Sequence, residues 1–202
     1  MKPKIKGRLH TDEKQMKIGK DDYYDINTID SKTKFIIEEE FMHSRTLKKI
    51  NNYFKRVKIT IYDQVLERYN IEKHKSAKKR KLITLVSDGF ENYKNGATKY
   101  LYRVCKIVFG VPIACKKYGL KHNNNHIERY NQNIDDRYKT TRHWKSFEST
   151  KATLKMRQFI HNFVNPHMEL NGKTPAEEAG INLGLGKNKL LELIHFAYMP
   201  KS

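Results

Sequence analysis

The stretch "RLHTDEKQMKIGKDDYYDINTIDSKTKFIIEEEF", residues 8–41, contains three strand-like runs separated by turn-forming residues. The first run ends at Gly19, where "GKDD" (19–22) indicates a tight turn, and a second turn is expected at Ser31–Lys32. Brief turns between consecutive strands favour antiparallel pairing of neighbours. These residues therefore predict a three-stranded antiparallel meander.

The hydrophobic period changes after this meander. Apolar residues recur three or four positions apart within residues 44–70, which predicts an amphipathic helix with Ser44 as its N-cap. The run "KLITLVSDG" (81–89) is continuously apolar until Asp88, as is typical of a strand buried on both faces. A short helix and the strand "KIVFGV" (106–111) follow. This order predicts one α/β domain with a mixed sheet flanked by helices.

The C-terminal part is expected to be helical. Four apolar residues at helical spacing predict a helix that ends at Asn165–Pro166: Met156, Phe159, Ile160 and Phe163. We interpret the aromatic set Phe147, Phe159 and Phe163 as part of the core and not as a recognition surface. A small helix, a glycine-containing break and a last amphipathic turn complete the chain.

The charge of the chain is strongly basic. Its 202 residues include 41 Lys and Arg against 22 Asp and Glu, a formal net charge of +19. Lys and Arg displace condensed counterions when they bind phosphates, so this excess favours a polyanionic partner. Nucleic acid is the first candidate and an anionic membrane surface is the alternative. The 38% hydrophobic content indicates a folded protein and not a disordered basic tail.

The sequence also indicates a compartment. It contains no apolar run long enough to span a bilayer, and its first residues lack the apolar stretch of a signal peptide. Cys105 and Cys115 fit no CxxC zinc pattern and suit a reducing environment. We therefore expect a cytoplasmic location.

Two segments concentrate the positive charge. The stretch "KHKSAKKRK" (73–81) is either a solvated loop or a phosphate contact. The stretch 122–147 places Glu128 among amides and basic residues, where it is either an ordinary ion-pair partner or the ligand of a cation held beside a phosphate backbone. In the second case its neighbours are expected to contact DNA: Asn125, Arg129, Arg137, Lys139, Arg142 and Lys145.

Three carboxylates on separate elements could form a metal site. Asp12 lies in the first strand, Asp88 ends the buried strand, and Glu128 lies on a helix far downstream. If they converge, their hard oxygens suit Mg²⁺ or Mn²⁺, and two such ions about 3.5–4 Å apart can promote phosphodiester chemistry. Spacing alone does not select this triad, because Asp12 could pair with Lys14 and Asp88 could serve only as a turn residue.

Five collinear segments resemble the DDE transposase and integrase superfamily, especially insertion-sequence transposases with a retroviral-integrase-like core. "LHTDEKQMKI" resembles the strand of its first aspartate, "LVSDGFENY" its second-aspartate motif and "NNHIER" its glutamate helix. "RYKTTRHWKSF" and "FVNPHMELNGKTPAEEAGI" resemble its basic and C-terminal signatures. The resemblance runs from about residue 9 to about residue 181.

The resemblance implies an RNase H-like fold with a mixed five-stranded sheet between helices, in which residues 1–181 form the catalytic core and residues 182–202 a helical tail. It implies strand cleavage and transfer of a 3′-hydroxyl to target DNA, with two Mg²⁺ or Mn²⁺ ions held by Asp12, Asp88 and Glu128. Asp135 is the substitute if Glu128 is not the third ligand.

The family also implies a setting. Its members act on transposon ends and target DNA as dimers or larger assemblies, which predicts a nucleoid-associated homodimer or higher oligomer. They usually carry a DNA-binding region before the first aspartate, so we expect a truncated copy. Two alternatives stay open: a non-catalytic DNA-binding remnant, and an RNase H-like nuclease that hydrolyses strands without joining them.

Overall fold

A computed structural model describes residues 2–110, 130–132, 134 and 146–198. Its five-stranded sheet has the order β3-β2-β1-β4-β5. The strands are β1 (Leu9–Ile18), β2 (Asp21–Asp30), β3 (Ile36–Met42), β4 (Thr84–Ser87) and β5 (Lys106–Phe109). The first three pair in antiparallel fashion, whereas β4 is parallel to both β1 and β5. The predicted meander and the predicted mixed sheet are confirmed.

The two turns of the meander have local causes. Gly19 adopts a φ of 63°, a left-handed conformation that glycine reaches without strain, and it allows the tight β1–β2 connection. After β2, the buried carboxylate of Asp30 accepts hydrogen bonds from the Thr33 hydroxyl at 3.0 Å and the Lys32 amide at 3.2 Å. These bonds close the turn that leads into β3.

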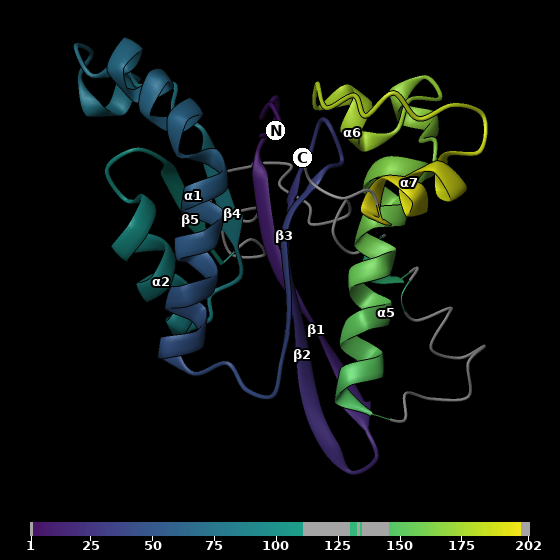
Figure 1. The fold of residues 1–202 in the computed structure, drawn as a ribbon. Coiled ribbons are helices and arrows are strands. Elements are labelled where there is room, and N and C mark those ends of the chain that lie inside the picture. Colours follow the sequence, from purple (N-terminus) through teal and green to yellow (C-terminus); the bar gives the residue numbers. More distant parts are fainter. Residues whose placement is uncertain (1, 111–129, 133, 135–145, 199–202) are drawn as a thin grey trace.

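One face of the sheet is covered by two helices, α1 (Leu47–Glu72) and α2 (Glu91–Leu101), as Figure 1 shows. Helix α1 begins later than predicted, and Thr46 instead of Ser44 is its N-cap residue. The two helices pack closely because Gly96 has no side chain: a Cβ there would lie 2.7 Å from the ring of Phe54. Buried apolar side chains of α1, α2, β1 and β4 form the larger core.

The opposite face is covered by α5 (Phe147–Phe159) and its continuation, the π-helical turn η2 (Ile160–Val164) (Figure 1). Short segments follow: η3 (Met168–Leu170), α6 (Pro175–Glu178) and α7 (Lys189–Tyr198). The chain also forms a 3₁₀ turn, η1 (Ala77–Lys79), after α1. None of the described helices is long and apolar enough to cross a membrane.

The buried row of α5 and η2 differs from the predicted one. Met156 is 56% exposed and Phe159 is 45% exposed, so the expectation that Phe159 belongs to the core is wrong. The residues that face the sheet are instead Thr150, Leu154, Gln158 and Asn162. Phe147 and Phe163 are partly buried against the two cores, as expected.

The hydrogen bonds of Asn162 show why polar side chains of this helix face the sheet. Its side-chain oxygen accepts a hydrogen bond from the Ile36 amide at 2.9 Å, and its amide nitrogen donates to the Ile36 carbonyl at 3.0 Å. Strand β3 lies at the edge of the sheet, so on the side of Ile36 away from β2 there is no further strand to pair with. Asn162 therefore supplies hydrogen bonds that a further strand would otherwise provide.

We expect Asn162→Ala to lower the free energy of unfolding by about 2 kcal/mol, because it leaves the buried Ile36 N–H unpaired and leaves the Ile36 carbonyl only the longer bond from Gln158, at 3.4 Å. Urea denaturation at neutral pH measures this loss. Met156→Ala, on the exposed side of the same helix, is the matched control and should change stability by less than about 0.5 kcal/mol. Equal losses for both variants would contradict the structural role of Asn162.

Candidate active site

The parallel pairing of β1 with β4 brings Asp12 next to Asp88. The last paired residues are Thr11 and Ser87, and the residue that follows each of them is an aspartate. Neighbouring strands lie about 4.8 Å apart. Two carboxylates from distant parts of the sequence therefore extend from adjacent backbone positions, and both residues are partly exposed.

Asp88 is oriented by the turn that it begins. Its Oδ1 accepts a hydrogen bond from the amide of Phe90 at 3.0 Å, and the Ser87 hydroxyl donates to its carbonyl at 3.1 Å. Phe90 is the N-cap residue of α2. The aspartate is thus a turn residue, as the simpler interpretation expected, but this bond uses only one carboxylate oxygen.

The remaining predicted site residues lie outside the described residues. They are Glu128, its substitute Asp135, Asn125, Arg129, Arg137, Lys139, Arg142 and Lys145. The structure therefore brings together two of the three predicted metal ligands. Within its described part, no group of three or more His, Cys, Asp or Glu is close enough to hold a metal ion. Two adjacent, partly exposed carboxylates are nevertheless the hard-oxygen donors that Mg²⁺ or Mn²⁺ prefers.

Arg45 connects β1, which carries Asp12, to the turn after β4 that contains Asp88. It forms an ion pair with Glu13, the residue after Asp12, whose side chain lies on the α1–α2 face of the sheet. Its guanidinium carbon lies 4.4 Å from the ring centroids of both Tyr24 and Phe90. Cation–π contacts of this kind are worth about 0.5–2 kcal/mol each. We call this contact set the Glu13–Arg45–Phe90 link; no local pattern in the sequence indicates this role for Arg45.

Tyr93 lies beneath this link and is fully buried. Burial is the main reason that the pKa of its phenol is raised, and the nearby carboxylates of Glu13 and Asp88 raise it further. Tyr93 therefore remains neutral and is a packing residue under the turn that carries Asp88.

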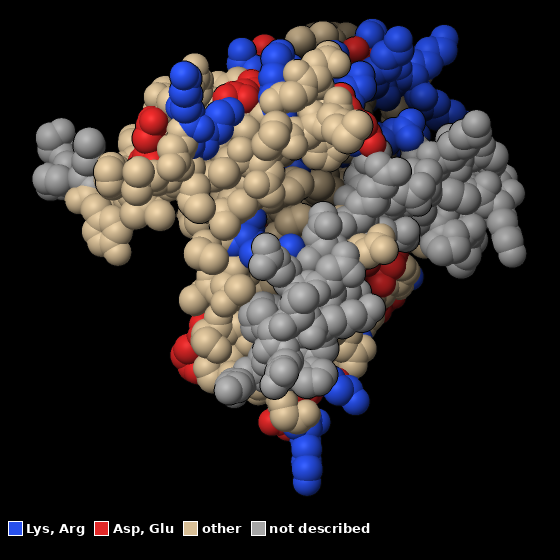
Figure 2. Space-filling model, turned by 90° about the vertical axis from the view of Figure 1, so that its right-hand side faces the viewer, with Lys and Arg blue, Asp and Glu red and all other residues tan. Residues whose placement is uncertain are grey.

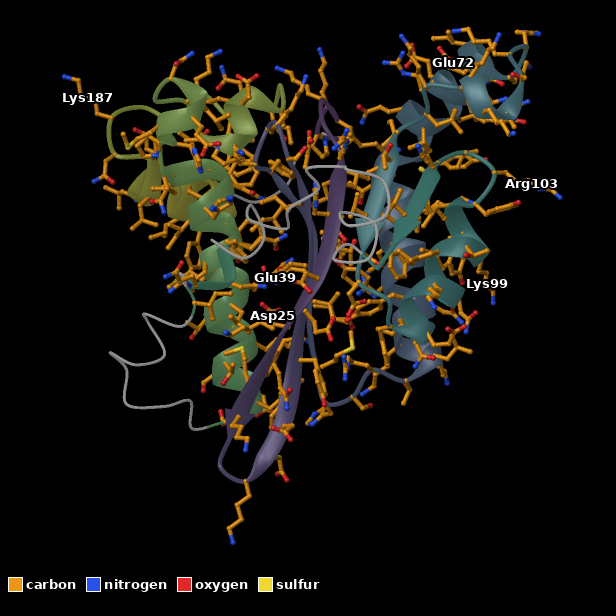
Figure 3. The ribbon with its side chains drawn as sticks, turned by 180° about the vertical axis from the view of Figure 1, so that it is seen from behind. Asp25, Glu39, Glu72, Lys99, Arg103 and Lys187 are labelled. Carbon is orange, nitrogen blue, oxygen red and sulfur yellow. The ribbon has the colours of Figure 1, made fainter. Side chains whose placement is uncertain are left out.

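A second acidic group lies on the same sheet face as Asp12. Asn27 is directly opposite Asp12 in β1 and directly opposite Glu39 in β3, and Asp25 is two residues from Asn27. The exposed fractions are only 0% for Asp25, 1% for Asn27 and 7% for Glu39. Figure 3 shows both carboxylates near the middle of the sheet. The side-chain amide of Asn27 donates a hydrogen bond to Asp25 Oδ2 at 3.0 Å.

Burial dominates the titration of this pair. It raises the pKa of Asp25 to about 6 and that of Glu39 to about 9, and the charge of Asp25 further raises the pKa of Glu39. Lys155 on α5 opposes both shifts. Glu39 therefore holds a proton at neutral pH, which limits the negative charge beside Asp12. The sequence carried a signal for this group, because Asp25 and Asn27 are in phase with Tyr23 and Ile29, which are buried on the same face.

No protein-family model and no curated protein sequence matches this chain. Solved structures do match. The HTLV-2 integrase catalytic core domain in complex with magnesium superposes with a TM-score of 0.51 at 12% identity in its trimeric form, over 89% of this chain and 99% of the viral one. Its dimeric form gives 0.50 at 12% identity, over 89% and 98%.

A simian T-cell lymphotropic virus intasome chain gives a TM-score of 0.51 at 10% identity, over 91% of this chain. The match covers only 60% of that viral chain. At such identities the likeness establishes the fold and nothing further. The fold is that of retroviral integrase catalytic cores, an RNase H-like α/β fold, and this part of the prediction is confirmed.

Proposed function

We propose that this chain is the catalytic core of a DDE-type polynucleotidyl transferase that cuts DNA strands and joins a freed 3′-hydroxyl to target DNA. One observation carries the proposal: the β1–β4 register places Asp12 beside Asp88 on an integrase-like fold. The net charge of +19 supports a DNA substrate.

In this proposal Asp12, Asp88 and Glu128 hold Mg²⁺ or Mn²⁺. Two such ions, when bound, activate the attacking oxygen and stabilise the leaving oxygen of a phosphodiester. The chain itself positions the ligands: β1 and β4 set the separation of the two aspartates, and the Phe90 amide orients one oxygen of Asp88. Asn125 and the basic residues around Glu128 are proposed to hold the DNA backbone.

The other parts of the proposal follow from the same resemblance. We propose residues 1–181 as the core, residues 182–202 as a helical tail, a homodimer or larger assembly on DNA, and a cytoplasmic location at the nucleoid. Two other functions use the same fold or charge. A nuclease would hydrolyse without joining, and a non-catalytic remnant would bind DNA through its charge alone.

A strand-joining assay tests the proposal. Labelled duplexes that carry the DNA flanking the coding sequence, and that end in a recessed 3′-hydroxyl, are incubated with plasmid and Mn²⁺. We expect label to enter the plasmid, and EDTA to abolish this product. Degradation without joining would indicate the nuclease instead. Salt-dependent binding with no product in Mg²⁺ or Mn²⁺ would indicate the remnant.

A further inference from the structure

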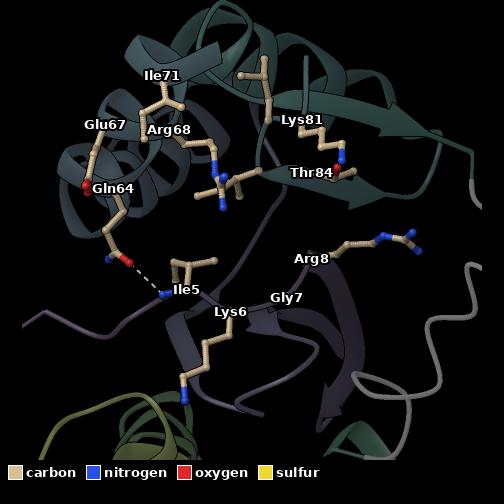
Figure 4. Close-up of a pocket in the computed structure, with 12 residues that line it drawn as sticks. Ile5, Lys6, Gly7, Arg8, Gln64, Glu67, Arg68, Ile71, Lys81 and Thr84 are labelled. Atoms are coloured by element: carbon tan, nitrogen blue, oxygen red, sulfur yellow. Dashed lines mark hydrogen bonds between the residues drawn. The ribbon is translucent and has the colours of Figure 1, made fainter. Parts of the chain in front are cut away.

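A cavity of about 470 Å³ lies at the end of the sheet opposite the aspartates. Residues 5–8, the last turns of α1 and residues 81–84 form its walls (Figure 4). It therefore opens where the parallel strands β1 and β4 begin, whereas Asp12 and Asp88 lie further along them. Asp88 is four positions after Thr84 along the strand, a distance of about 13 Å. The cavity is thus separate from the candidate active site.

Two cations define the chemistry of this cavity. Figure 4 shows Arg68 reaching from α1 towards the N-terminal segment and Lys81 lying beside Thr84. Lys6 also lines the cavity, but its ammonium group pairs with Glu178 at 2.6 Å. Within the described residues, neither Arg68 nor Lys81 forms an ion pair with a carboxylate. Glu67 also lines the cavity, and Arg68 contributes, after Lys75 and the Lys81 amide, to lowering the pKa of Glu72. Neither carboxylate forms an ion pair with Arg68 or Lys81, so these two cations can still contact an anion.

Hydrogen bonds fix the cavity walls. Gln64 on α1 accepts from the Ile5 amide at 2.8 Å and donates to the Pro3 carbonyl at 2.7 Å, so it fastens the N-terminal segment to the helix. On the other side, the Lys81 amide donates to Glu72 at 2.9 Å. These contacts attach both the N-terminal segment and the start of residues 81–84 to α1, the helix that carries Arg68.

The positive charge continues outside the cavity. Lys73, Lys78 and Lys79 are exposed on the connection that follows α1. Arg80 shapes this connection by donating to the carbonyls of Lys73 and Lys75, at 3.0 Å each. Figure 2 shows Lys and Arg side chains gathered along the top of the molecule, the end where β1 begins and α1 ends in Figure 1. We call Arg68, Lys73, Lys78, Lys79 and Lys81 the distal basic surface.

We propose that the distal basic surface binds the phosphate backbone of duplex DNA, at a place distinct from the DNA that reaches Asp12 and Asp88. The proposal rests on the proposed function, because it takes DNA as the substrate. A free phosphate or nucleotide would need only Arg68 and Lys81. The exposed lysines beyond the cavity extend the charge over a surface that several consecutive phosphates can contact, since duplex DNA carries one charge per about 1.7 Å.

The test measures binding of a labelled 30-base-pair duplex by fluorescence anisotropy, without divalent metal, over a range of salt concentrations. Each lost phosphate contact should reduce the slope of log K against log salt by about 0.9. Two double variants test the surface: Arg68→Ala/Lys81→Ala and Lys78→Ala/Lys79→Ala. We expect each to lose one or two phosphate contacts, which reduces the magnitude of the slope by about 0.9–1.8. Thermal denaturation of each variant checks that the fold is retained.

The matched control is Lys99→Ala/Lys187→Ala, which removes the same charge from α2 and from the connection before α7 (Figure 3). An unchanged slope for this control, with reduced slopes for the two test variants, supports the proposal. Equal slopes for all three variants would overturn the proposal. A second result would also overturn it: calorimetry shows that the parent protein binds inorganic phosphate or a nucleoside triphosphate and that Arg68→Ala/Lys81→Ala does not, while the DNA binding of that variant is unchanged. Because the assay contains no metal, its result does not depend on strand cleavage or joining.

Discussion

Asp88→Asn should reduce Mn²⁺-dependent cleavage of duplex DNA by about 10³-fold or more. A bound metal ion contributes several kcal/mol of charge stabilisation in reactions of this kind, and about 4 kcal/mol corresponds to that factor. The asparagine side chain keeps an oxygen that can accept from the Phe90 amide, so the turn and the fold should persist. DNA affinity should stay equal or rise, because a negative charge near phosphates is removed. A gel-based nicking assay and an anisotropy titration measure the two effects.

The control for this variant is Asp21→Asn, the same change at an exposed position at the start of β2. It should retain the cleavage rate of the parent protein. Calorimetry with Mn²⁺ adds a readout that is independent of activity, since Asp88→Asn should lose heat of binding that Asp21→Asn keeps. Cleavage by Asp88→Asn at the parental rate would remove Asp88 from the proposed metal site.

Glu39→Gln should stabilise the protein increasingly as the pH rises. The folded state holds the Glu39 proton up to about pH 9, whereas an unfolded chain releases it near the ordinary glutamate value of 4.5. Between these values the folded state binds more protons, so the parent protein loses stability as pH increases. At 1.36 kcal/mol per pH unit, the loss between pH 5 and pH 9 is on the order of 5 kcal/mol. Glutamine does not titrate and should remove it.

Urea denaturation at intervals from about pH 5 to pH 9 gives the difference in unfolding free energy between variant and parent at each pH. His161, whose pKa burial lowers to about 4, titrates equally in both proteins and cancels in this difference. Met156→Ala is the control: it changes an exposed side chain that carries no ionisable group, so its difference from the parent protein should not vary with pH. A flat difference for Glu39→Gln as well would show that Glu39 is ionised in the folded protein.

Much of the fold could be predicted because hydrophobic period and turn residues are local signals. The meander, the strand ending at Asp88 and helix α1 follow from them. The buried side of α5 could not be predicted in this way. Gln158 and Asn162 are buried because they form hydrogen bonds with the edge peptide of Ile36, and polar residues do not contribute to an apolar period. A period of apolar residues locates a helix more reliably than it identifies the helix face in contact with a sheet.

The candidate site was predictable in part from motif resemblance, and not from local hydrophobic period. Motif resemblance selected Asp12 and Asp88, but their adjacency depends on β4 inserting beside β1, a long-range pairing that no local pattern encodes. Asp25 and Glu39 were missed because acidic residues are usually exposed, and only the alternation along β2 indicated an inward position for Asp25. Arg45 was missed because its three contacts come from separate strands and a turn.

The Glu13–Arg45–Phe90 link lies behind the sheet, on the α1–α2 face, while Asp12 lies on the other face. In the proposed function DNA reaches Asp12 from that other face, so the link sets the separation of the two catalytic candidates from a side that faces away from the DNA. Tuning of catalytic geometry and tuning of substrate contacts are consequently separate problems for evolution and for protein engineering. A library confined to residues around Arg45 could change reaction rate while leaving the DNA-facing chemistry intact.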